Sequence, residues 1–251
     1  MSSTPVQPPA TEPAALSEGA RLLDVFIAPT KTFTDLRRSA MWWAPFLILA
    51  IVAVGFVYVV DRNIGFRKVT ENQIAASSKA SARIEQMQPE QRNQALNQQA
   101  KITRYISYGY WIFVLVWNII VALILFGTFK LVAGSDVKFS TSIAVVMYAC
   151  LPLSLKSVLA AVSVLAGVSP DSFTFQNPIA TNPGYFLDPT SSHFLYSLGT
   201  SLDVFMIWTL VLTAIGFTCV SKLKRSTAYA VVFGWYVLVM IVGAALAAAF
   251  S

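Results

Sequence analysis

Four polar or helix-distorting residues interrupt the long apolar runs of this chain, and they are the first candidates for chemistry. Lys156 lies near the middle of the apolar run 141–167, one helical turn after Pro152. Asp203 lies near the start of another apolar run, and Asn118 lies in the middle of a third. A lysine at the centre of a bilayer costs about 2.5–3.5 kcal/mol on insertion scales, so Lys156 should face protein or water instead of lipid.

The chemistry open to Lys156 depends on what its ammonium group meets. It can snorkel toward the headgroups, form a structural ion pair with Asp203, or bind an anionic substrate or lipid headgroup. Pro152 removes a backbone hydrogen bond, which leaves carbonyl groups free to receive the ammonium group. Asn118 is expected to hydrogen-bond to a neighbouring helix. The sequence leaves the choice among the three roles of Lys156 open.

Patterns typical of enzymes and metal sites are weak in this chain. His193 is its only histidine, and Cys150 and Cys219 both fall in apolar runs without metal-ligand spacing. The chain also lacks a glycine-rich phosphate loop and a cluster of intramembrane carboxylates. We therefore expect a protein that is not an enzyme and that binds neither a cofactor nor a metal.

The elements that position these residues are membrane helices. Of the 251 residues, 56% are hydrophobic and only 12% are charged, with a mean hydropathy of +0.62, far from the composition of soluble domains. About twenty helical residues cross a ~30 Å hydrocarbon core. Five apolar runs reach this length: about 42–60, 106–133, 141–167, 199–220 and 228–250. We expect an all-α, polytopic five-helix bundle in domain 41–251, in contact with the lipid bilayer.

The residues before the first span divide into two segments. Residues 1–17 are rich in Pro, Ser and Thr and have no apolar core of a signal peptide, so we expect a disordered tail. Residues 18–40 are amphipathic, which predicts two short helices in the membrane interface, with a partner-docking helix as the alternative. The expected interface anchors are Trp42, Trp43, Arg37 and Arg38.

Two polar segments connect the apolar runs. The insert 62–105 is rich in helix-forming residues and predicts an extramembrane helical hairpin that starts its second arm at Pro89. The segment 168–198 has several prolines and aromatic residues but no Lys or Arg, so we expect an ordered cap on the bundle. Basic residues gather instead beside the first span and in the 221–226 loop. They place the N-terminus in the cytoplasm and the C-terminus outside, although the insert is itself basic.

Several stretches resemble the Yip family of Ypt-interacting membrane proteins, specifically its prokaryotic branch. They are DVFIAPTKTF, MWWAPFL, YACLPLSL and LDVFMIWTLVLTAIGF, and together they extend over about residues 20–248. The resemblance implies five membrane helices and a cytoplasmic N-terminus. In the eukaryotic branch it also implies binding of Rab-type GTPases, but the acidic-Leu-Tyr-Gly-Pro signature of that branch is absent before the first span, so we do not carry this activity over.

These observations favour a non-enzymatic organiser or adaptor for membrane partners or lipids in a bacterial inner membrane. The alternative is a small transporter, channel or lipid-handling protein that uses Lys156. Membrane-protein partners or a homo-oligomer fit the organiser. Nucleic-acid binding does not fit, because the basic residues behind the net charge of +6 lie in short loops beside spans.

Overall fold

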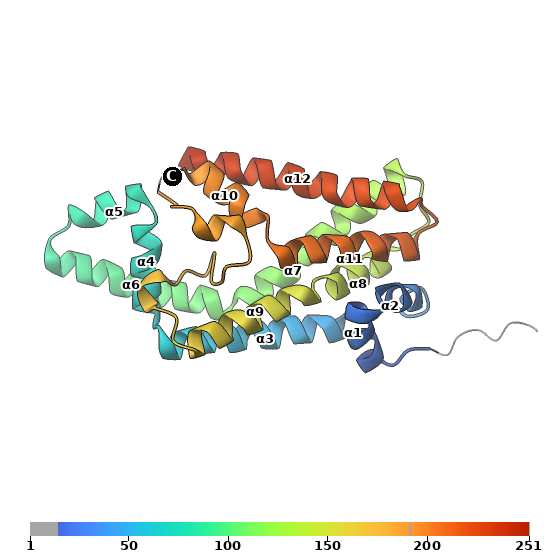
Figure 1. The fold of residues 1–251 in the computed structure, drawn as a ribbon, viewed down its shortest axis with the longest axis horizontal. Helices are drawn as coiled ribbons and strands as arrows, with labels where there is room; N and C mark the ends of the chain where they lie inside the picture. The colour runs from blue at the N-terminus through green and yellow to red at the C-terminus, as the bar shows by residue number, and fades with distance from the viewer. Residues whose placement is uncertain (1–14, 191, 251) are drawn as a thin grey trace, which may run out of the picture.

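The computed structural model describes residues 15–190 and 192–250, apart from the side chain of Phe250, and its described part consists of helices and loops without strands (Figure 1). The predicted all-α class is therefore confirmed. The disordered tail predicted for residues 1–17 lies mostly outside the described residues. The helices are α1 (Glu18–Ile27), α2 (Pro29–Asp35), α3 (Trp43–Asn63), α4 (Phe66–Ala75), α5 (Ser78–Glu85), α6 (Pro89–Tyr108), α7 (Tyr110–Gly127), α8 (Phe139–Ala149), α9 (Leu151–Leu165), α10 (His193–Ser201), α11 (Val204–Val220) and α12 (Arg225–Phe250).

Four helical segments in the described part of the chain are long and apolar enough to cross a membrane. They are α3, α7 with the π-helical turn Thr128–Val132, α8 together with α9, and α12. A fifth crossing exists only if α10 and α11 count as one broken span, because their axes differ by 53°. The sequence predicted a span over about 199–220, and the structure adds a break at Leu202–Asp203 near the start of that segment. The physical reason is that the Asp203 side chain caps a new helix.

The third span bends where the sequence places its proline. Helix α8 ends at Ala149, and α9 starts at Leu151 with Pro152 in its first turn. The proline has no N–H to donate, so it is tolerated at a helix start. The N–H of Leu153 donates to the carbonyl of Cys150 at 3.0 Å, which tightens the junction into a short turn.

The bundle has two differently built ends. In Figure 1, α1, α2 and the 221–224 loop lie at one end, and α4–α6, α10 and the C-terminus lie at the other. At the second end the hairpin contacts the cap. Asn72 Nδ2 donates to the carbonyls of Pro170 and Phe173 at 2.7 and 2.8 Å, Lys68 pairs with Asp171, and the Phe66 and Phe175 rings stack at 6.0 Å. The insert and the cap therefore share one end of the molecule.

The hairpin of the insert has two helices in its first arm, α4 and α5, instead of one. They separate at Ser77, whose side chain accepts the N–H of Ala80 and begins α5. The second arm, α6, begins at Pro89 and is followed by α7 after Gly109. Arg104 and Tyr108 of α6 both donate to Asp61 Oδ2 at 3.0 Å, which ties the second arm to the end of α3.

The N-terminal helices pack on the bundle, which the interfacial prediction did not foresee. Val25, Phe33 and Leu36 are fully buried, and α2 lies along α11. Leu23 and Ile27 point elsewhere and are 69% and 81% exposed. Some apolar residues of this segment are thus buried against the bundle and others are exposed. Only the exposed ones can contact a membrane surface.

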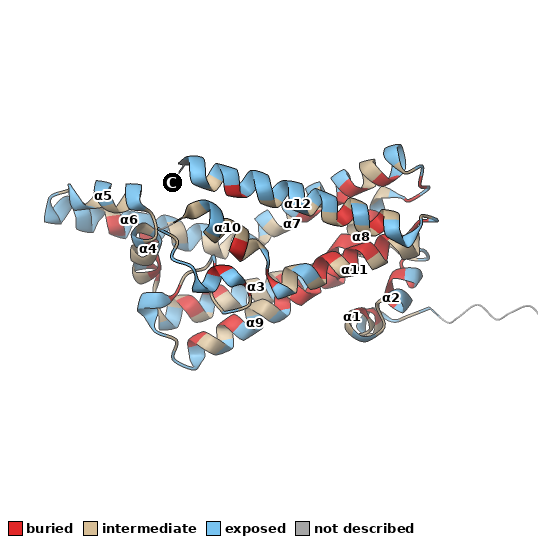
Figure 2. Ribbon diagram, turned by 45° about the horizontal axis from the view of Figure 1, so that its top comes forward, coloured by how far each residue is buried: buried red, intermediate tan, exposed pale blue. Residues whose placement is uncertain are grey.

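Helix α8 forms the centre of the core. Residues 144–149 are all buried there, and α7 and α11 pack against this helix. Figure 2 shows the buried residues concentrated along α8 and α11, whereas α12 is mostly exposed. Only 11% of the apolar window of α12 is buried inside the protein, so its apolar surface is left for lipid.

A close approach of α2 to α11 predicts the effect of a single methyl group. A Cβ atom added at Gly216 would lie 2.5 Å from Cγ1 of Val145 and 3.0 Å from Cδ1 of Phe33. Val145 is β-branched and fully buried, so it cannot rotate away. We expect Gly216→Ala to lower the free energy of unfolding in detergent by about 1–3 kcal/mol, measured by denaturant titration. Gly234→Ala is the matched control, since a Cβ there meets nothing within 4 Å; an equal effect of the two substitutions would contradict this packing.

The arrangement of the two ends predicts accessibility from the two sides of the membrane. We expect single cysteines at Ser78 and Ala180 to react with an impermeant maleimide from outside, because the hairpin and the cap share one end. A cysteine at Ser226, beside the loop of the other end, should react only after the membrane is opened. Cys219 is replaced by alanine in each variant. Labelling of Ser226→Cys together with the other two in intact spheroplasts would contradict a broken span that crosses the membrane.

Candidate functional site

Asp203 is placed at the break between α10 and α11, where it begins the second helix. Its Oδ1 accepts the backbone N–H groups of Phe205 and Met206 at 3.0 and 3.4 Å. These N–H groups are among the four that a helix start leaves without intrahelical partners, and the positive end of the helix dipole favours a carboxylate there. One oxygen of Asp203 is therefore committed to the helix start.

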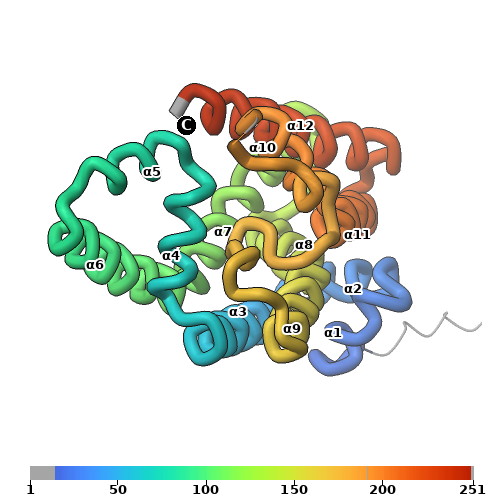
Figure 3. Tube along the Cα trace, turned by 60° about the vertical axis from the view of Figure 1, so that its left-hand side comes forward, coloured from blue at the N-terminus to red at the C-terminus, as the bar shows by residue number. Residues whose placement is uncertain are grey.

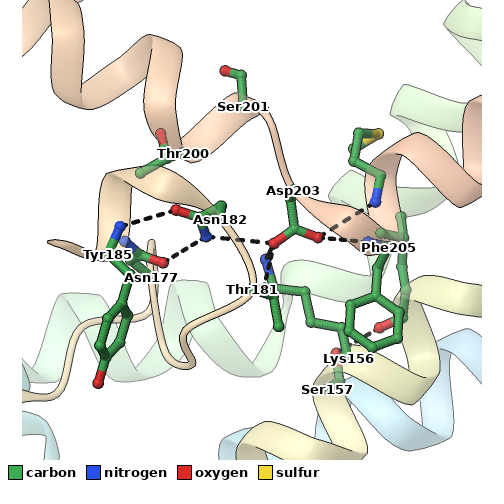
Figure 4. Close-up of polar contacts among 12 residues, drawn as sticks. Lys156, Ser157, Asn177, Thr181, Asn182, Tyr185, Thr200, Ser201, Asp203 and Phe205 are labelled. Carbon is green, nitrogen blue, oxygen red and sulfur yellow. Dashed lines mark hydrogen bonds and ion pairs between the residues drawn. The ribbon is translucent and has the colours of Figure 1, made fainter. Parts of the chain in front are cut away.

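The other oxygen of Asp203 receives Lys156, which reaches it from α9. The Nζ–Oδ2 distance is 2.7 Å, and the two side chains are 21% and 5% exposed (Figure 4). Of the three roles that the sequence left open for Lys156, the structure shows the ion pair. The lysine stem spans the gap between the two helices, and the opposite charges compensate each other where neither is fully hydrated.

The cap also binds Asp203, through a short segment ahead of α10. Thr181 Oγ1 donates to Oδ2 at 2.5 Å, and Asn182 Nδ2 lies 3.4 Å from the same atom. Asn182 also donates to Asn177 Oδ1 at 2.8 Å and accepts the N–H of Tyr185 at 3.1 Å. These contacts, drawn in Figure 4, connect the cap directly to the break in the helix. Sequence reasoning missed all of the cap residues, whose only signal was the turn-forming Asn182-Pro183-Gly184.

A glycine pair holds the cap against α10. A Cβ atom at Gly184 would lie 2.5 Å from the backbone nitrogen of Thr200, and one at Gly199 would lie 2.8 Å from the nitrogen of Gly184. The two backbones can approach this closely only because neither residue has a side chain. The close contact keeps Thr181 and Asn182 beside Asp203.

A shallow cavity of about 230 Å³ adjoins the ion pair. Its walls include Leu153, Lys156, Ser201, Asp203 and Tyr236. The Tyr236 hydroxyl donates to the carbonyl of Ser201 at 2.5 Å, so α12 closes one side of the break. Because Lys156 and Asp203 neutralise each other, an anion that entered the cavity would have to compete with Asp203 for the ammonium group.

The other predicted residues lie apart from this pair. Asn118 of α7 donates to Met147 Sδ at 3.6 Å and accepts from Cys150 Sγ at 3.6 Å, so it joins α7 to α8 as an inter-helix contact. Trp42 packs on Phe46 with ring centroids 6.1 Å apart, and Trp43 is 49% exposed. Arg37 and Arg38 are exposed beside the start of α3, at the same end of the bundle as Trp42 and Trp43. Pro152 lies at the start of α9, one turn before Lys156.

A second buried charge network fixes the N-terminal helices, and sequence reasoning missed it. Arg21 is 3% exposed and donates to Asp35 Oδ2 at 2.8 Å and to Glu18 Oε1 at 2.7 Å. Tyr148 of the central helix donates its hydroxyl to Glu18 Oε2 at 2.7 Å. Burial lowers the pKa of Arg21, but the hydrogen bond to Asp35 and the charge of Glu18 outweigh it, so the pKa is raised and the charge is kept. The spacing of Glu18 and Arg21, three residues apart, was the one available signal.

The residues suited to metal binding are dispersed. Among the described residues, no group of three or more His, Cys, Asp or Glu side chains gathers in a metal-binding arrangement. Cys150 is a buried free thiol and Cys219 a half-buried one.

Asp203 makes more hydrogen bonds than Lys156, so we expect its removal to lower the free energy of unfolding more. Asp203→Ala removes the N-terminal capping residue of α11, the ion pair with Lys156 and the contacts with Thr181 and Asn182 of the 168–198 segment. It should therefore lower the free energy of unfolding by about 3–5 kcal/mol. Lys156→Ala leaves Asp203 with its other donors and should cost about 1–3 kcal/mol. The loss in the double variant should be smaller than the sum by about 1–2 kcal/mol. Thermal and denaturant unfolding in detergent measure all three, with the exposed Lys222→Ala as control. Strictly additive losses would contradict the pairing.

Comparison with known proteins places the chain in a family. The family profile described as the Yip1 domain matches residues 23–247, nearly the whole sequence. Searches of curated proteins and of solved structures find no match. The matched region contains the central α8, the broken α10–α11 segment, the Lys156–Asp203 pair and all the helices long enough to cross a bilayer. The chain is therefore a multi-pass integral membrane protein that belongs to the Yip1 domain family.

Proposed function

We propose that this protein is a non-enzymatic organiser of membrane partners or lipids, a member of the prokaryotic branch of its family, in a bacterial inner membrane. Its N-terminus lies in the cytoplasm and its C-terminus outside, with α10 and α11 as a broken fifth span. The basic residues beside α2 and in the 221–224 loop support this orientation, because they share one end of the bundle.

The observation that carries the proposal is the fixed docking of the N-terminal helices. The Glu18–Arg21–Asp35 network joins α1 to α2, and the Tyr148 hydrogen bond and the buried Phe33 hold this pair on the bundle. Leu23 and Ile27 remain exposed. Ordered elements that keep large apolar side chains outward are typical of surfaces that bind a partner or the membrane interface. The exposed Arg37 adds basic charge for acidic partners or anionic headgroups, whereas Lys31 is paired with Asp24 at 2.8 Å.

A second function is favoured by one specific feature, the broken helix beside Lys156. Transporters build substrate sites from discontinuous helices whose half-helix starts face a cavity near mid-membrane. The α10–α11 break, the adjoining ion pair and the cavity of about 230 Å³ fit that description. We keep transport, channel activity or lipid handling through Lys156 as the alternative. The ion pair supports the organiser instead, because its satisfied charges stabilise the fold.

The organiser predicts a specific contact at the exposed face of α1. A photo-crosslinking amino acid at Leu23 should form a discrete adduct in intact cells. The same probe at Leu159, which is 48% exposed on the membrane helix α9, should give only diffuse lipid adducts. Asp35→Asn weakens the buried network and should reduce the adduct at Leu23 several-fold, because the surface is then no longer held in place. Diffuse adducts at both positions alike would contradict the proposal.

A flux measurement separates the organiser from the transport alternative. Purified protein in liposomes should show no solute flux that depends on Lys156. A flux abolished by Lys156→Met, with the unfolding midpoint unchanged, would favour the transport alternative.

A further inference from the structure

A second, larger cavity lies at the end of the bundle that carries the hairpin and the cap. Its volume is about 420 Å³, within the ~300–1,000 Å³ of small-molecule sites. Its walls come from four segments: the α4 end with Gln73 and Ala76, the cap with residues 174–176 and Pro189, α10 with His193, Tyr196 and Ser197, and α12 with Ala247. Figure 3 shows α4, α10 and the C-terminal part of α12 together at this end. The site is separate from the ion pair, although Gln176 also lines the smaller cavity.

The walls of the cavity combine apolar surface with several side chains that form hydrogen bonds. Two amides (Gln73 and Gln176) and the hydroxyls of Thr174 and Ser197 line the cavity, and no Lys, Arg, Asp or Glu does. A side-chain amide both donates and accepts hydrogen bonds, and so does a hydroxyl group. This set matches a ligand with several hydroxyl groups. It does not match a phosphate, which selects Arg, Lys or a helix start.

The aromatic residues of the walls restrict the class of ligand further. The side chains of Phe175 and Tyr196 line the same cavity. Aromatic faces pack against the C–H surfaces of a sugar ring, while its hydroxyl groups remain free to pair with amides. Amides and aromatic rings in one cavity therefore favour a saccharide over a simple glycerol group.

One buried atom beside the cavity lacks a hydrogen-bond partner in the part of the chain that the structure describes. Nε2 of His193 is buried and has no hydrogen-bond partner among the described residues. An unpaired buried polar group costs free energy, so such atoms are normally satisfied by protein, water or a ligand. His193 lines the cavity, so a small rotation of its ring toward the cavity would let a ligand hydroxyl supply the missing bond.

The position of the cavity indicates that the sugar is attached to a lipid. Ala247 belongs to α12, whose outer face exposes Val242 and Leu246 at 48% and 52%. Leu195 of α10, the helix that packs on α12, is 58% exposed. A headgroup in the cavity would thus have apolar helix surface beside it for its acyl chains.

We propose that this cavity binds the uncharged sugar headgroup of a glycolipid. The inference deepens the lipid side of the proposed function, but it concerns the opposite end of the bundle from α1. A negative crosslinking result at Leu23 would therefore not contradict glycolipid binding. Absence of glycolipid binding would not contradict the organiser function.

Native mass spectrometry of the full chain tests the proposal. The protein is released from lauryldimethylamine oxide, which has no sugar, and titrated with glucosyl diacylglycerol, diacylglycerol and phosphatidylglycerol of matched acyl chains. We expect the glucolipid to bind at least about tenfold more tightly than the other two, because only its headgroup can pair with the amides. Equal affinity for the three lipids, or a preference for phosphatidylglycerol, would overturn the proposal. So would displacement of the glucolipid by methyl glucoside at equal concentration, since the lipid part would then contribute nothing.

Substitutions in the cavity separate binding from folding. Gln176→Leu should weaken glucolipid binding about fivefold or more through lost hydrogen bonds, whereas Gln98→Leu, at an exposed position of α6, should not. His193→Phe removes the unpaired buried nitrogen, so it should raise the unfolding midpoint of the lipid-free protein and weaken glucolipid binding. A variant that is more stable yet binds the glucolipid unchanged would overturn the role of His193.

Discussion

The carboxylate of Asp203 connects three parts of the molecule that are distant in sequence. One oxygen caps α11, and the other accepts Lys156 of α9 and Thr181 of the cap. A carboxylate with this little solvent is tolerated only when its lone pairs are filled and a positive charge is close. The helix break, the orientation of the cap and the placement of Lys156 are therefore coupled, because each supplies part of the hydrogen bonds and charge that Asp203 needs.

The end of the bundle that carries α1 also has a buried charge that is satisfied by partners of opposite charge, but with different residues. Arg21 is buried between Glu18 and Asp35, and Tyr148 of the central helix donates to Glu18. Such a network contributes little net stability compared with an apolar contact, but it accepts only one arrangement of its partners. The apolar contact of Phe33 with α11 supplies area, and the charges set the docking position.

The two ends of the bundle thus present different surfaces on one rigid core. The end with α1 and α2 exposes apolar and basic side chains, whereas the end with the hairpin and the cap contains an uncharged, aromatic cavity. Helix α8 lies between them and contributes both Tyr148 to the first end and the packing surface for α11. This asymmetry would let the organiser that we propose contact different partners or lipids on the two sides of the bilayer.

The sequence by itself determined the features that depend on local composition. Hydropathy summed over about twenty residues identified the membrane class and the long apolar helices. Pro89 marked a helix start and Pro152 a distortion of the third span, because a proline lacks the N–H that a helix interior needs. The insertion cost of a charge also showed that Lys156 had to face protein or water. The family resemblance, carried by the motifs around Pro152 and Asp203, agreed with the profile match over residues 23–247.

Only the tertiary structure decided which groups meet. Lys156 and Asp203 are 47 positions apart, and their pairing depends on the depth and rotation of two helices that hydropathy does not encode. The break at Leu202–Asp203 was invisible for the same reason, because the apolar run continues through it while the cap and Lys156 stabilise a helix start there. The amphipathic segment 18–40 was expected in the membrane interface, yet its Phe33 lies in the core, because an amphipathic stripe has the same pattern whether lipid or protein covers it.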